Sequence, residues 1–194
     1  MRRLIAASTL TALLLPAMLL PSVAFAADDY KIDAAHSAVL FKAHHFGAGY
    51  TWGRFNEFDG TFEVDEQGNP TAINITVKAE SVDTHNEKRD KHLRSPDFLN
   101  AGEFQTVTFK ATEIKAAGEG KWTATGELTL HGVTKPITVE VTKAGEGKDP
   151  WGGYRYGFET AFSVERSDFG FFNEDGIGDT IAMTIAIEGT KKKL

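Results

Sequence analysis

Apolar and polar residues alternate along much of the chain. The pattern is clear in residues 73–79 (INITVKA) and 107–111 (VTFKA), and it recurs in 122–130, 137–141 and 181–187. Thr, Lys and Glu fill most of the intervening places. A period of two places successive side chains on opposite faces of a strand, so each segment is predicted to be a strand with one apolar face.

Three further segments are aromatic-rich and of strand length: residues 37–46, 51–64 and 154–164. Short Gly-, Asp- and Asn-containing stretches separate the predicted strands, and short connections favour antiparallel neighbours. The count is about eight. The predicted fold is all-β, an extended eight-stranded antiparallel up-and-down barrel, which leaves no exposed sheet edge.

Residues 81–102 interrupt the alternation between the third and fourth predicted strands. A short helix is expected there, capped by Asp83 or Thr84 and ended by Pro96. The stretch RDKHLRSPDFLN (89–100) is rich in charge, and its i, i+4 spacing predicts an ion pair between Asp90 and Arg94. Its apolar residues Leu93, Phe98 and Leu99 are predicted to plug one end of the barrel.

The N-terminus has the three parts of a secretory signal peptide. Arg2-Arg3 precede an apolar run over residues 4–20, and Ala24-Phe25-Ala26 forms a small-residue cleavage pattern. Removal after Ala26 is favoured over a membrane anchor because prolines interrupt the run. Residues 27–194 then form a single domain in the periplasm.

Composition narrows the chemistry. The chain has no cysteine, which excludes disulfides, a thiol nucleophile and zinc-thiolate sites. Its net charge of −6 argues against nucleic acid or an anionic membrane held by bulk electrostatics. His44 and His45 are adjacent in a strand and point to opposite sides, so they cannot share an ion, and no metal site is predicted. No hydrolase triad is recognisable.

Aromatic residues of the predicted strands are the candidates for an interior. Eight strands is the number at which a barrel either fills with side chains or holds one slender ligand, and periodicity leaves both readings open. The residues expected to turn inward and line a ligand pocket are Phe41, Trp52, Phe55, Phe58, Phe62, Phe109, Trp122, Phe158 and Phe162.

Five stretches together resemble the YceI family of periplasmic lipocalin-like proteins. They are YKIDAAHSAVLFKAHHFG, GRFNEFDGTFEVDE, SVDTHNEKRDKHLRSPDFLN, GELTLHGVTKPITVEV and DPWGGYRYGFE, in order over nearly all of residues 27–194. The resemblance implies an extended eight-stranded barrel that binds a polyisoprenoid, an isoprenoid quinone or polyprenyl phosphate, with no catalytic activity and no cofactor. ERSDFGFFNEDGIGD is only loosely like its counterparts in the family.

A long prenyl chain would leave a polar headgroup at the barrel mouth. The candidates to meet a quinone carbonyl or a phosphate are His36, His44, Arg54, Arg89 and Arg94, with arginine better suited to phosphate. A homodimer is left open.

Three functions compete. The first is a non-catalytic periplasmic carrier or scavenger of an isoprenoid amphiphile. The second is an enzyme acting on a lipid-like substrate inside the barrel, with His44 near Arg54 or Asp59 as its titratable pair. The third is an eight-stranded outer-membrane barrel, against which the chain ends in GTKKKL instead of an aromatic strand.

Overall fold

The computed structural model describes residues 27–171 and 176–191. Within them, eleven strands form one antiparallel sheet. The predicted signal peptide, residues 1–26, lies outside the described residues. The strands are β1 (Asp28–Ile32), β2 (Ala38–His45), β3 (Gly49–Phe55), β4 (Phe58–Val64), β5 (Pro70–Lys78), β6 (Val82–Asp83), β7 (Thr106–Gly118), β8 (Lys121–Leu130), β9 (Val133–Lys148), β10 (Tyr154–Glu165) and β11 (Ile177–Lys191).

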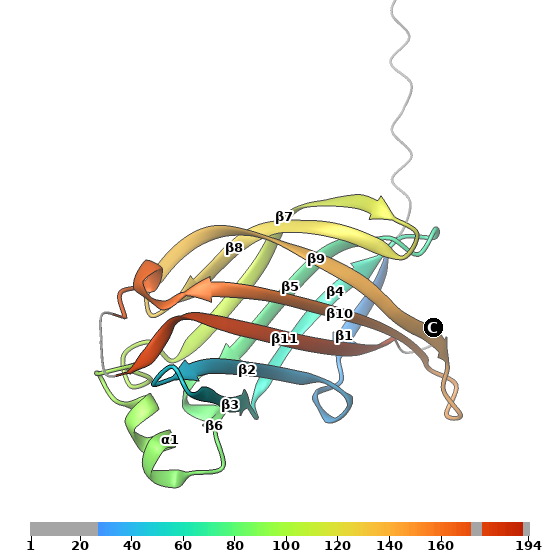
Figure 1. The fold of residues 1–194 in the computed structure, drawn as a ribbon. Helices are drawn as coiled ribbons and strands as arrows, with labels where there is room; N and C mark the ends of the chain where they lie inside the picture. The colour runs from blue at the N-terminus through green and yellow to red at the C-terminus, as the bar shows by residue number, and fades with distance from the viewer. Residues whose placement is uncertain (1–26, 172–175, 192–194) are drawn as a thin grey trace, which may run out of the picture.

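The sheet closes into a barrel because β1 pairs on both sides. β1 is antiparallel to β4, and it also pairs with the end of β11, where Lys31 lies opposite Thr190 and Ile32 opposite Gly189. Among the described residues the closed ring is therefore β1-β4-β5-β7-β8-β9-β10-β11. The all-β, eight-stranded antiparallel barrel predicted from the alternation is confirmed (Figure 1).

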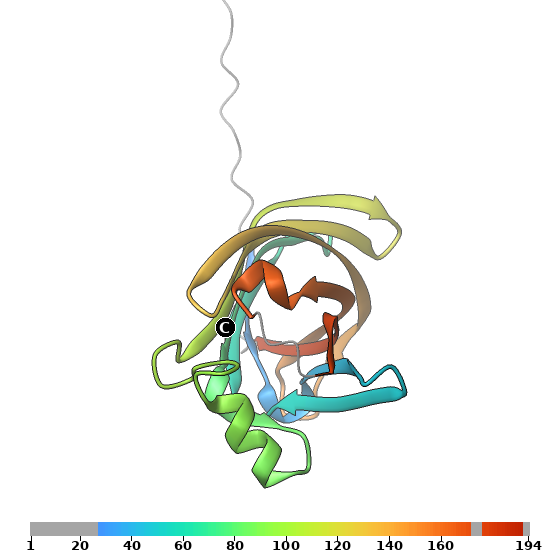
Figure 2. The same cartoon turned by 60° about the vertical axis from the view of Figure 1, so that its left-hand side comes forward.

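The remaining strands extend the sheet from β11. β2 pairs with β11 over Ile177–Ala186, next to the part that β1 occupies, and β3 and β6 follow it outward. Figure 2 shows the β2–β3 hairpin standing out from the ring. The 3-10 helix η1 (Ala34–His36) joins β1 to β2, and η2 (Ala79–Ser81) and η3 (Arg166–Phe169) follow β5 and β10.

Residues 51–64 do not form the single strand expected from the sequence. The backbone N–H of Asn56 donates to Ser81 O at 3.0 Å, and Glu57 O accepts from Lys78 N at 2.9 Å. The chain thus changes hydrogen-bonding partners between β3 and β4. The alternation of apolar and polar residues also did not predict β1 or the two-residue β6.

Helix α1 (Glu87–Arg94) lies between β6 and β7 and confirms the predicted helical segment. Its N-cap is Asn86, whose side chain accepts from Arg89 N at 3.0 Å; the caps expected at Asp83 or Thr84 were wrong. The predicted Asp90–Arg94 pair is also wrong. Buried Asp90 instead accepts the backbone N–H of Thr84 at 2.9 Å and its hydroxyl at 2.5 Å.

No helix in the part of the chain that the structure describes is long and apolar enough to cross a membrane.

Candidate ligand-binding cavity

The inside of the barrel is hollow and apolar. An inner chamber with a cavity volume of about 120 Å³ lies between Phe62, Val141 and Phe158. An outer chamber of about 150 Å³ lies nearer to α1, between Phe41, Leu99 and Phe171. Each is several times the space that one water needs, and both are walled almost wholly by hydrocarbon.

The two chambers adjoin. Phe55, Val107, Leu128 and Met183 line both of them. Several inward-facing side chains around them are only partly buried, although they pack against the core: Phe41, Val107, Phe109, Phe162 and Met183. A fully packed interior would bury such residues completely, so this barrel is not filled by its own side chains.

Six of the nine predicted aromatic residues line a chamber: Phe41, Phe55, Phe62, Phe109, Phe158 and Phe162. Phe58 and Trp122 are buried in the surrounding core, and Trp122 Nε1 donates to Asn69 Oδ1 at 3.2 Å. Whether the lining residues contact a ligand stays a prediction.

Trp52 does not turn inward, contrary to expectation. It lies opposite Lys42 on the outer face of the β2–β3 hairpin and is 55% exposed. The physical reason is the period of the strand: Phe55 faces inward, so Trp52, three residues earlier, must face outward. The inward position next to it is Gly53. A Cβ built there would lie 2.2 Å from Cζ of Phe41, so the ring occupies that space.

Aromatic rings close the inner end of the cavity. Tyr30 stacks on Phe62 with ring centroids 5.0 Å apart, and Tyr156 contacts both rings edge-on. The Tyr156 hydroxyl donates to Gly68 O at 2.6 Å. Burial, then the nearby charge of Asp28, raises the pKa of Tyr30 to about 12, and burial likewise raises the pKa of Tyr156. Both phenols therefore stay neutral at physiological pH.

The other end is covered by the segment around α1. Leu93, Phe98 and Leu99 line the outer chamber, as predicted for the apolar residues of RDKHLRSPDFLN. The charges of that segment hold its backbone in place: Arg89 Nε donates to Thr84 Oγ1 at 2.7 Å, and Arg94 Nη1 donates to Glu80 O at 3.3 Å.

Arg166 is a charged residue of the outer chamber that the sequence analysis missed. It is 9% exposed, and its Nε and Nη2 donate to Gly178 O and Ile177 O, each at 3.1 Å. A signal was present in the sequence. Phe158, Phe162 and Val164 share the inward face of β10. Arg166, two residues after Val164, follows the same period, although it lies in η3 just beyond the strand.

None of the five predicted headgroup residues is among the lining residues of either chamber in the described part of the chain. His44 lies on the outer face of the hairpin, with its ring 5.1 Å from that of Tyr50. Arg54 is exposed opposite Asp83 of β6. Arg89 donates to Thr84, and Arg94 donates to the carbonyls of Glu80 and Val82. His44 and Arg54 lie at separate registers of the hairpin, opposite Tyr50 and Leu40, which does not favour the catalytic pair considered from sequence.

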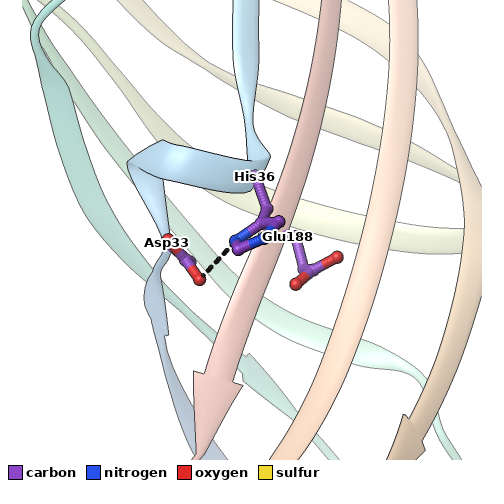
Figure 3. A group of neighbouring side chains, drawn as sticks. All are labelled: Asp33, His36 and Glu188. Atoms are coloured by element: carbon purple, nitrogen blue, oxygen red, sulfur yellow. Dashed lines mark hydrogen bonds and ion pairs between the residues drawn. The ribbon is translucent and has the colours of Figure 1, made fainter. Parts of the chain in front are cut away.

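The fifth residue, His36, belongs to a charged cluster on the outer wall (Figure 3). Its Nδ1 lies 2.8 Å from Asp33 Oδ2. The ligand atoms of Asp33, His36 and Glu188 lie within 4.8 Å of one another, a grouping that could hold a metal ion. However, the Arg155 guanidinium already pairs with Asp33, at 3.0 Å, and with Glu188. Arg155 thus already supplies a cation to these carboxylates, and the cluster ties η1 to β10 and β11.

One buried polar atom faces the inner chamber from β10. Thr160 shares the inward face of Phe158 and Phe162, and its hydroxyl has no hydrogen-bond partner among the described residues. An unpartnered hydroxyl in an apolar interior costs stability. The interior therefore offers a ligand very little hydrogen bonding and a large apolar surface.

A closed antiparallel barrel with a hollow apolar interior defines the class of lipocalin-like barrels. Within that class, the chain belongs to the YceI-like domain family, whose model matches residues 30–189.

Individual relatives agree with this assignment. A UPF0312 protein from Pseudomonas paraeruginosa is 44% identical over 189 residues, which is 95% of this chain and 98% of the relative. The crystal structure of a Campylobacter jejuni YCEI protein matches with a TM-score of 0.68 and 29% identity, over 73% of this chain and 85% of that one. A polyisoprenoid binding domain from Saccharophagus degradans shares the fold, with a TM-score of 0.60 and 16% identity over 84% of this chain and 98% of that one.

Proposed function

We propose that this protein is a periplasmic, non-catalytic carrier or scavenger of a long isoprenoid amphiphile, an isoprenoid quinone or polyprenyl phosphate. The observation that carries the proposal is the pair of adjoining apolar chambers with four lining residues in common, which in this proposal are occupied by one slender chain. The Saccharophagus degradans relative in fold, described as a polyisoprenoid binding domain, supports the same ligand class.

Hydrophobic burial supplies the binding energy in this proposal. A prenyl chain that fills both chambers removes several hundred Å² of apolar surface from water, a gross gain on the order of 10 kcal/mol before ordering costs. Few polar contacts are then required.

The headgroup lies at the α1 end. Arg166 brings a positive charge to the wall of the outer chamber, whereas the inner end is closed by aromatic rings. A guanidinium group donates charge-assisted hydrogen bonds to electron-rich oxygens such as a phosphate or quinone oxygen, as that of Arg166 does to two backbone carbonyls. Arg166 thus replaces the five residues that we expected from sequence.

Two alternatives are less well supported. An enzyme requires titratable groups that converge on the cavity, and Glu159 and Arg166 line different chambers. An outer-membrane barrel requires an apolar outer band, whereas the outer faces of β7 and β8 carry exposed Lys110, Lys115 and Glu127.

Native mass spectrometry of the exported protein, purified without detergent, is the direct test. A bound species of several hundred daltons that lipid extraction identifies as a prenyl quinone or phosphate is the expected result. A mass that remains that of the protein alone, even after incubation with such lipids, would refute the carrier function.

A further inference from the structure

Three exposed aromatic side chains lie on the β2–β3 hairpin of this protein, two on its outer face and one at its tip. Phe46, Tyr50 and Trp52 of the β2–β3 hairpin are 69%, 59% and 55% exposed. Among the described residues, the only other large hydrophobic side chain so exposed is Trp151, in the β9–β10 loop. Exposed aromatic side chains that cluster in this way mark an interaction surface more often than scattered ones do.

The strand pairing of the hairpin places Tyr50 and Trp52 on its outer face, whereas Phe46 lies at its tip, with its ring 4.4 Å from that of His45. Tyr50 and Trp52 lie opposite His44 and Lys42, and Lys42 Nζ lies 4.8 Å and 5.3 Å from the centroids of their rings. On the inner face Gly53 makes room for Phe41, so the register cannot slip without a clash. The aromatic surface is therefore preorganised.

The charge of the hairpin is opposite to that of the whole protein. Hairpin residues 38–55 contain Lys42, Arg54 and two histidines and no Asp or Glu, in a chain whose net charge is −6. Lys42 lies beside the exposed rings, whereas Arg54 lies opposite Asp83 of β6. Bulk electrostatics would repel an anionic surface, but this local region attracts one within a Debye length. Trp and Tyr beside Lys and Arg are also the side chains that favour the headgroup layer of a bilayer.

The positive charge of the hairpin disfavours a second copy of this chain as the partner that binds this surface. A symmetric pair would bring each Lys42 near its own copy, and like charges at an interface oppose association. An anionic bilayer instead complements both the aromatic rings and the positive charge.

The hairpin also lies at the outer-chamber end of the barrel. Phe46 N donates to Gly176 O at 2.7 Å, and His45 pairs with Ile177, whose carbonyl accepts from Arg166. The inner face of the hairpin contributes Phe41 and Phe55 to that chamber. Figure 1 shows α1 and the tip of the hairpin at one end and the β9–β10 loop at the other.

We propose that the outer face of the β2–β3 hairpin is a docking surface for anionic phospholipid membranes. Docking through Tyr50, Trp52 and Lys42, with Phe46 exposed at the tip, brings the α1 end of the barrel, and with it the outer chamber, close to the bilayer. This inference does not depend on the identity of any ligand in the barrel.

Co-sedimentation of the protein that begins at Ala27 with unilamellar vesicles tests the proposal. The protein is expected to bind vesicles of phosphatidylglycerol and phosphatidylcholine, more weakly at high salt, and to bind pure phosphatidylcholine vesicles much less. Trp52→Ala is expected to lower the partition coefficient about tenfold, and Lys42→Glu by at least about tenfold. Trp52→Phe should retain most of the binding.

Trp151→Ala is the matched control, because it removes an even more exposed tryptophan, 83% against 55%, at the other end of the barrel, beside Asp149. It should leave vesicle binding unchanged. Circular dichroism and thermal midpoints confirm that each variant is folded.

Three results would overturn the proposal: no binding of the folded wild-type protein to anionic vesicles, binding that Trp52→Ala leaves unchanged, or equal loss with Trp151→Ala. A dimer in light scattering that Trp52→Ala dissolves, without vesicle binding, would assign the surface to a second copy. Native mass spectrometry of Trp52→Ala distinguishes this surface from the carrier function, because the variant should lose vesicle binding and still retain any lipid bound inside the barrel.

Discussion

Gly53 and Phe41 face each other across the β2–β3 hairpin, inside the barrel, so closely that the ring occupies the space of any side chain at position 53. Gly53→Ala must push the ring toward the outer chamber. We expect a loss of about 1–2 kcal/mol in unfolding free energy. Urea denaturation measures it, and Gly49→Ala, where nothing lies within 4 Å, serves as control. Adding Phe41→Leu to Gly53→Ala should recover part of the loss; no recovery would contradict the contact.

Asp90 is a buried carboxylate that satisfies both the backbone N–H and the hydroxyl of Thr84. Asp90→Ala leaves both donors without their acceptor, so we expect a loss of about 2–4 kcal/mol in unfolding free energy. Asp97→Ala, which removes an exposed acid next to the same helix, should cost less than about 0.5 kcal/mol. Equal effects of the two variants in urea denaturation would show that the Asp90 contacts contribute little.

Thr160→Val replaces the unpartnered hydroxyl by a methyl group of similar size. Because no hydrogen bond among the described residues is lost and a polar atom leaves the apolar interior, we expect the protein to become more stable by about 1 kcal/mol. Thr129→Val, which breaks the exposed 2.8 Å contact with Thr134, should not stabilise it. A lower thermal midpoint for Thr160→Val would mean that the hydroxyl is satisfied, for example by water.

The cluster around Asp33 predicts a pH-dependent contribution to stability. The hydrogen bond from His36, followed by that from Arg155, lowers the pKa of Asp33 below its usual value of 3.8. A depressed carboxyl pKa stabilises the fold fully above the unfolded pKa, and this contribution is lost as the pH falls through the folded pKa. Wild type should therefore exceed Asp33→Asn in unfolding free energy at neutral pH, and the difference should shrink below about pH 4. A difference that persists unchanged in stronger acid would contradict this.

The junction between the chambers predicts a dependence on ligand length. Val107 lines both chambers, so Val107→Phe should obstruct the passage between them. If the carrier proposal holds, affinity for a long prenyl chain should fall at least about tenfold, because the buried area of one chamber is lost. A short prenyl chain should bind nearly as before. Val107→Ile controls for added volume, and equal losses for both chain lengths would place the ligand elsewhere.

The two-residue period of each strand decides how much of this structure could be predicted from the sequence. Alternation identified most strands and the all-β class, because one face of each strand must avoid water. The same rule assigned Phe158 and Phe162 to one face correctly. It could have excluded Trp52, which shares its face with Arg54, and it could have found Arg166 by extending the period of β10.

The sequence by itself determined most of the strands, the presence of the short helix and the apolar character of the interior, since these follow from local periodicity. Only the tertiary structure decided that β1 and β2 share the edge of β11, and that the rings of Phe58 and Trp122 pack as core while a hollow remains beside Phe109. The reason is that strand pairing and cavity volume depend on contacts between residues far apart in the chain, such as Ile32 with Gly189. A local sequence pattern therefore does not predict whether side chains from opposite walls of the barrel contact each other or leave a cavity.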